Sequence, residues 1–114
     1  MQKWKSQLRK GLVELTLLAA LRDQGEAYGY QLLQVLADVE GMTFSESTIY
    51  PVLARMAQNG LVKSRMVPSE SGPKRRYYLL SPKGLTRLDE LAAEWQSVSR
   101  SINRLLQLDE SGDK

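Results

Sequence analysis

The sequence contains no cysteine and no histidine among its 114 residues. Without cysteine, the chain can form neither a disulfide bond nor a thiolate metal site. Without histidine, it lacks the commonest general base, the commonest metal ligand and the usual partner of a serine nucleophile. An enzyme based on carboxylates or lysine remains an alternative, but no motif supports one. We therefore expect no enzymatic activity, no bound metal and no cofactor.

Long hydrophobic runs are also missing. The apolar run at 15–21 is too short to cross a bilayer, and no small-residue cleavage pattern follows it. The length and the 42% hydrophobic content suit one domain with a modest core, which would gain from further burial by oligomerisation. We expect a single-domain cytoplasmic protein without a membrane partner.

Acidic residues are scarce in two segments of the chain. Residues 1–10 contain four lysines and arginines and no acid, and residues 63–76 contain five against one acid. Residues 11–54 contain a single arginine against six acids, although the whole chain has a net charge of +3. Two separate basic segments are typical of a protein that binds a polyphosphate, although two solvated surface patches are the simpler alternative.

Hydrophobic spacing predicts three helices in the first half of the chain. The first covers about 7–23, with leucines three and four residues apart, and its wide apolar stripe predicts contact with its own domain and with a second chain. The second covers about 29–39, with Val39 facing inward. The third begins near Ser47, which would place Pro51 in or near its first turn, where proline is tolerated.

Two strands are predicted after the third helix, over 61–67 and 76–80, on either side of a turn-rich basic loop at 68–75. Two strands and a basic loop after a helix pair indicate a wing. The fold class is therefore predicted to be mainly α with a small two-stranded β-wing: a winged helix-turn-helix followed by a long C-terminal helix.

The last helix starts with Ser81 as N-cap and Pro82 at its first position. Apolar residues then recur at alternating gaps of three and four, as in a heptad seam: Leu88, Leu91, Trp95, Val98, Ile102 and Leu105. We expect this seam to pair with a second copy, while packing on its own domain is the alternative. The predicted boundaries are 1–80 for a DNA-binding domain whose first helix also joins the dimer, 81–108 for a dimerisation helix and 109–114 for a frayed tail.

In a helix-turn-helix protein, the second helix of the pair enters the major groove of DNA. Here that helix opens with hydroxyl-bearing residues that can contact phosphates or bases, and for the first two serines capping is an equal alternative. The wing cations can neutralise phosphates or reach the minor groove. The predicted DNA-binding residues are Ser45, Ser47, Thr48, Tyr50, Arg55, Lys74, Arg75 and Arg76.

Three segments together resemble the PadR-type regulators of the short kind, over about residues 7–106. These segments are STIYPVLARM at 47–56, YGYQL at 28–32, and RRYYLLSPKG at 75–84. The resemblance implies a homodimeric repressor that binds inverted repeats and in some members responds to phenolic or drug-like aromatic compounds.

Trp95 occupies a seam position, where two facing indoles could hold a flat aromatic molecule or could simply fill the dimer core. The resemblance implies a pore at the dimer centre, and helical geometry adds neighbours to it. The candidate ligand-binding residues are Trp95, Leu12, Leu15, Val98 and Ser99.

A different function class, a winged helix that binds only other proteins, would also fit this fold. The basic segment at 74–76 favours DNA, because a protein-interaction module does not need it.

Overall fold

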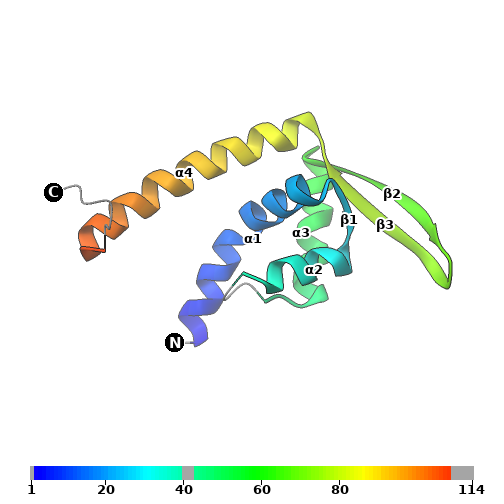
Figure 1. The fold of residues 1–114 in the computed structure, drawn as a ribbon, viewed down its shortest axis with the longest axis horizontal. Helices are drawn as coiled ribbons and strands as arrows, with labels where there is room; N and C mark the ends of the chain where they lie inside the picture. Colours follow the sequence, from blue (N-terminus) through cyan, green and yellow to red (C-terminus); the bar gives the residue numbers. More distant parts are fainter. Residues whose placement is uncertain (1, 40–42, 109–114) are drawn as a thin grey trace.

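The structure, a computed structural model, describes residues 2–39 and 43–108. Within them the helices are α1 (Gln2–Gln24), α2 (Gly29–Ala37), α3 (Glu46–Gln58) and α4 (Pro82–Leu106), and the strands are β1 (Glu26–Tyr28), β2 (Val62–Ser69) and β3 (Gly72–Leu80). The predicted class is confirmed: mainly α, with a wing and a long last helix. In Figure 1, α4 and the β2–β3 hairpin extend from the helical body in opposite directions. The predicted tail at 109–114 lies outside the described residues.

Helix α1 supplies the centre of the core through its C-terminal half. Leu17, Leu18 and Leu21 are fully buried and pack with buried residues of α2 and α3. The helix begins at Gln2, five residues before the predicted start, so its first half carries exposed apolar side chains. Leu8, which belongs to the predicted apolar stripe, is one of them, because the body of the domain covers only the second half of α1.

Helix α2 packs between α1 and α3 and is shorter than predicted. It buries Leu32 and Leu36. Because it ends at Ala37, Val39 does not face inward and is 48% exposed. Gly41, which follows the predicted end of this helix at 39, lies outside the described residues.

The sheet has three antiparallel strands, with β3 in the middle. Strand β1 pairs with the end of β3 through Ala27 opposite Tyr78, and both residues are buried. The sequence did not predict β1, because three residues are too few for an alternating pattern to be recognised.

The wing strands are longer than predicted, so the expected loop at 68–75 is mostly strand. Pairing continues to Ser69 opposite Gly72, which leaves a turn of two residues. The prolines that suggested a loop lie at an irregularity, where Pro73 and Lys74 oppose the single Pro68. Proline is tolerated at such a bulge because the ladder is already interrupted there.

Helix α4 starts against the backbone of the α3–β2 turn. As predicted, Ser81 is the N-cap and Pro82 begins the helix; the Ser81 hydroxyl accepts from the Gly84 N–H at 3.0 Å and donates to the Gly60 carbonyl at 2.5 Å. The Ser81 N–H donates to the Leu61 carbonyl at 3.0 Å. A Cβ on Gly84 would lie 2.0 Å from that carbonyl oxygen, so only glycine fits there.

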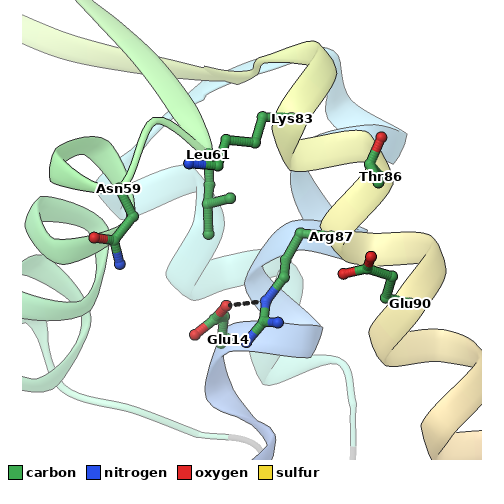
Figure 2. A pocket seen from close by; sticks show the side chains of 7 residues that line it. All are labelled: Glu14, Asn59, Leu61, Lys83, Thr86, Arg87 and Glu90. Carbon is green, nitrogen blue, oxygen red and sulfur yellow. Dashed lines mark hydrogen bonds and ion pairs between the residues drawn. The ribbon is translucent and has the colours of Figure 1, made fainter.

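An ion pair ties the next turn of α4 to α1. Arg87 Nε donates to Glu14 Oε2 at 3.2 Å, as Figure 2 shows. This pair lies in a hollow of about 480 Å³ that carries both charge signs and is lined by Glu14, Asn59, Leu61, Lys83, Thr86, Arg87 and Glu90. The pair is solvent-accessible on both sides, so we attribute the position of α4 mainly to its buried N-terminal turn.

We expect Gly84→Ala to lower the free energy of unfolding by about 3 kcal/mol, because the added methyl group would overlap rigid backbone. Gly72→Ala is the matched control: its Cβ would meet only the Ser69 hydroxyl, at an ordinary 3.5 Å, so its effect should stay within about 0.5 kcal/mol. Urea denaturation followed by circular dichroism measures both. Equal stabilities of the two variants would contradict the tight junction.

Candidate nucleic-acid interface and apolar groove

Helix α3 starts one residue earlier than predicted, with Ser45 as its N-cap. The Ser45 hydroxyl makes no hydrogen bond to the helix backbone. It instead shares hydrogen bonds with the Ser47 hydroxyl at 2.8 Å and the Thr48 hydroxyl at 3.2 Å. Ser45 and Ser47 are exposed and Thr48 is half-buried. Three hydroxyl groups therefore gather at the entrance of α3, where the free helix N–H groups also favour an anion.

The outward face of α3 contains residues that the sequence reasoning did not single out. Ile49, Leu53 and Met56 face the core. The opposite face is the exposed stripe Ser47, Pro51, Ala54 and Gln58, with spacings of four, three and four. Arg55, also exposed, flanks this stripe. The spacing of the apolar residues that face the core could have predicted this stripe. Pro51 and Ala54 were not among the predicted DNA-binding residues, because neither side chain forms hydrogen bonds.

Pro51 is the sixth residue of α3, just beyond the first turn, which agrees with the prediction that it lies in or near that turn. It cannot donate to the carbonyl of Ser47, so one helical hydrogen bond is lost close to the helix start. The side chain of Pro51 is exposed. Because the proline ring is short and fixes the backbone φ angle, the outward face of α3 is low and rigid at this position.

Tyr50 joins α3 to the beginning of α2. Its ring lies against Gly29, where an added Cβ would be 2.4 Å from Tyr50 Cε1. Partial burial, and secondarily the nearby Glu46 carboxylate, raise the pKa of Tyr50, so its phenol stays neutral near pH 7. Tyr50 is still 41% exposed, so it combines a packing role with a partly accessible surface.

The predicted wing cations do not share one face of the hairpin. Arg75 Nη1 donates to the Tyr28 hydroxyl at 3.0 Å, and the guanidinium carbon lies 4.5 Å from the centre of the Tyr28 ring. Tyr77 packs edge-on against the same ring, 5.2 Å between centroids. Arg76, one residue further along β3, points to the other face, where its Nη1 donates to the Ser64 hydroxyl at 3.1 Å. Lys74 is exposed at the bulge.

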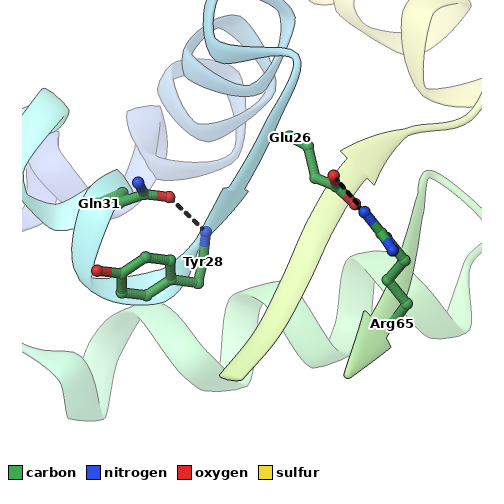
Figure 3. Close-up of polar contacts among 4 residues, drawn as sticks. All are labelled: Glu26, Tyr28, Gln31 and Arg65. Atoms are coloured by element: carbon green, nitrogen blue, oxygen red, sulfur yellow. Dashed lines mark hydrogen bonds and ion pairs between the residues drawn. The ribbon is translucent and has the colours of Figure 1, made fainter. Parts of the chain in front are cut away.

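A bidentate ion pair crosses the sheet on the face that carries Tyr28. Arg65 of β2 donates from Nε and Nη2 to the two carboxylate oxygens of Glu26 of β1, at 2.7 and 2.9 Å (Figure 3). Hydrogen bonding to Arg65 lowers the pKa of Glu26, so the carboxylate is ionised at neutral pH. The same figure shows Gln31 Oε1 accepting from the Tyr28 N–H at 3.0 Å, which fixes the turn from β1 into α2.

The predicted seam on α4 divides into two parts. Leu88 is 2% exposed and Leu91 packs against the core, so both serve their own domain. Leu88 was therefore wrongly placed among residues free to pair with a second chain. The remainder of the seam is exposed, from 45% to 83%, in Trp95, Val98, Ile102 and Leu105.

An open apolar groove of about 520 Å³ runs between α1 and α4. Four members of the candidate ligand-binding set line it: Leu12, Leu15, Trp95 and Val98. The rest of the lining is Leu8, Gly11, Leu91 and Ile102, with the polar side chains of Gln7, Glu14, Arg87 and Glu94. Ser99 does not line the groove: it follows Val98 on the helix and is therefore turned by about 100°. It lies instead in a polar hollow beside Gln96, Arg100 and Asn103.

Within the described ranges, no helix is long and apolar enough to cross a membrane. The same residues contain no group of three acidic side chains placed to hold a metal ion, and the sequence has neither histidine nor cysteine to add to one.

The helix pair α2–α3, the β2–β3 hairpin and the long α4 define a winged helix-turn-helix protein of the DNA-binding class. The model of the transcriptional regulator PadR-like family matches residues 17–90. This chain belongs to that family, which is one of DNA-binding transcriptional regulators and not of enzymes.

Solved structures agree with this family over nearly the whole chain. A PadR family transcriptional regulator from Eggerthella lenta is 31% identical, with a TM-score of 0.81, covering 95% of this chain and 93% of the other. A PadR-like transcriptional regulator from Bacillus cereus is 40% identical, with a TM-score of 0.78 and coverage of 89% and 97%. A PadR-like transcription factor from Bacteroides fragilis is 34% identical, with a TM-score of 0.74 and coverage of 90% and 98%.

We expect Gly29→Ala to cost about 1–2 kcal/mol of stability, because the new methyl group displaces the Tyr50 ring. In a Tyr50→Ala background the same change should cost nothing, since the ring is gone. A double-mutant cycle measured by urea denaturation gives this coupling. Equal costs of Gly29→Ala in both backgrounds would show that the two residues do not interact.

Proposed function

We propose that the chain is a homodimeric repressor that acts in the cytoplasm on an inverted-repeat operator. Residues 1–80 would form the DNA-binding domain, and residues 81–108 the dimerisation helix. The observation that carries this proposal is the set of exposed apolar side chains on α4 and α1. Helix α4 itself extends away from the wing, as Figure 1 shows. A second copy bound there would leave both recognition helices accessible.

The proposed dimer surface combines two stripes. On α4 it begins at Trp95 and continues through Ile102 to Leu105; on α1 it contains Trp4 and Leu8, which are 59% and 46% exposed. A contiguous apolar surface of this kind is typical of a protein interface. A two-fold axis would relate two winged domains, and the matching DNA site would be an inverted repeat.

The proposed DNA surface is α3 with the wing. The hydroxyl groups of Ser45, Ser47 and Thr48, the Tyr50 hydroxyl and Arg55 would face the major groove and its phosphates. The cations at 74–76 would add positive charge from the hairpin beside it. A protein-interaction module is the alternative, but it gives no reason for outward hydroxyl groups at the start of α3 and cations on the hairpin.

The first test is gel-shift titration against DNA from upstream of its own gene. We expect binding that survives random competitor DNA and weakens steeply with salt. Ile102→Glu, which places a charge in the apolar stripe, should weaken self-association at least about a hundredfold and weaken operator binding with it, since an unpaired buried charge costs about 3–5 kcal/mol.

Ser97→Glu is the matched control for that variant, because it adds the same charge to an exposed α4 position outside the seam. Sedimentation equilibrium measures the association. A dimer that persists in Ile102→Glu would refute the α4 interface, and equal affinity for operator and random DNA would refute the proposed operator.

We also propose that a planar aromatic effector binds at the dimer centre, in contact with Trp95. The apolar groove supports this proposal, because its walls are mostly apolar and the Trp95 indole offers a stacking surface. Trp95→Ala should abolish binding of 4-hydroxycinnamate and of acridine in calorimetric titrations. Tyr30→Ala, which removes an exposed aromatic ring from α2 outside both the groove lining and the proposed dimer surface, should leave binding within about twofold. Unchanged binding by Trp95→Ala would show that Trp95 only fills the interface.

A further inference from the structure

A cleft lies between the recognition helix and the wing. Its walls are Ala54, Ala57 and Gln58 of α3 and Ser64, Arg76 and Tyr78 of the hairpin, and its volume is about 410 Å³. It opens beside the outward stripe of α3, to which Ala54 and Gln58 also belong. The cleft is therefore continuous with the proposed DNA surface.

On the α3 side, two of the residues that line the cleft have very short side chains. Two alanines have no atoms beyond Cβ, so an entering group can approach the helix closely. Tyr78 lines the cleft from β3 and is buried, and desolvation by burial raises the pKa of its phenol, which is neutral. The cleft walls contain no carboxylate that would repel an anion.

Arg76 is the one cation in the lining of this cleft. Its Nη1 donates to the hydroxyl of Ser64, which also lines the cleft, so the guanidinium is held beside it. A guanidinium group has five N–H donors in a planar fork that matches two phosphate oxygens. The bond to Ser64 uses one of them, so the fork can also bind an oxyanion.

The other arginines of the wing are directed elsewhere. Arg65 binds both carboxylate oxygens of Glu26, so its charge is paired. Arg75 packs on Tyr28, on the face of β3 opposite to Arg76. The pleat of the strand thus separates Arg75 and Arg76, although they are adjacent in sequence.

We propose that the cleft between α3 and the hairpin seats one backbone phosphate of DNA, held by Arg76, and that Arg75 is a positioning residue that fixes the hairpin on Tyr28. The inference rests on the proposed DNA surface and gives two of its arginines different roles, phosphate binding for Arg76 and positioning of the hairpin for Arg75. When α3 lies in the major groove and the hairpin lies over the adjacent minor groove, the strand between the two grooves passes this cleft. Such a contact fixes the register on the duplex without reading the sequence.

The salt dependence of duplex binding tests this assignment. Each phosphate contact contributes about 0.9 to the slope of log K against log salt concentration. Because each protomer of the proposed dimer supplies one such contact, we expect Arg76→Gln to reduce the magnitude of the slope by about 1.8. Arg75→Gln, which removes the same charge, should reduce it by less than about 0.6. Both are measured on the full chain, with upstream DNA and with a scrambled duplex of equal length.

A second variant tests the cleft without removing a charge. Ala54→Leu should fill the cleft and reduce the slope by a similar amount to Arg76→Gln. Ala93→Leu, at an exposed α4 position outside the seam, should not change it. Circular dichroism and sedimentation equilibrium confirm that each variant is folded and associates normally.

Two outcomes would overturn the proposed phosphate site in the cleft, called the seat below. The first is an unchanged salt slope in Arg76→Gln. The second is a salt slope that Arg75→Gln lowers as much as Arg76→Gln does. Failure of the proposed operator is distinguishable, because wild-type protein would then bind both duplexes equally while Arg76→Gln still lowered the slope. If wild-type protein bound neither duplex at low salt, the seat and the operator would both be wrong.

Discussion

The position of every functional surface depends on one close contact, between the start of α4 and the backbone at Leu61. Gly84 lies so close to the Leu61 carbonyl that a methyl group cannot be accommodated. Ser81 adds hydrogen bonds to the same turn. That turn is also the end of α3 and the beginning of the wing. A long helix, a recognition helix and a hairpin are thus joined at one backbone junction.

A junction of this kind explains how two distant surfaces can keep a fixed relation. The apolar stripe of α4 starts after Leu91, where the helix leaves the domain core. The hydroxyl groups of α3 and the wing cations lie on the domain itself. If two copies join through α4, rigidity at Gly84 sets the separation of their DNA surfaces. A ligand that changed the angle between paired α4 helices would therefore change that separation.

Much of the architecture could be predicted from local pattern. The N-cap Ser81, the first-turn Pro82 and the heptad spacing each have a short-range physical cause, and the structure shows the helix they predict. The predictions were wrong where a residue distant in the sequence decides whether a segment forms a strand or whether a side chain is buried. Strand β1 exists because Ala27 pairs with Tyr78, and the wing strands extend past two prolines because pairing continues beyond them. Leu88 looked like any other seam residue until the domain was seen to cover it.

The sequence by itself determined the class of protein: helix starts, turn residues, basic segments and the absence of histidine and cysteine are all readable one residue at a time. Only the tertiary structure decided which neighbouring residues each side of a helix or strand contacts. Arg75 and Arg76 are chemically alike and adjacent, yet one packs on Tyr28 and the other opens into the cleft beside α3. The physical reason is that a strand alternates its side chains, and the surroundings of each face come from segments far away in the chain.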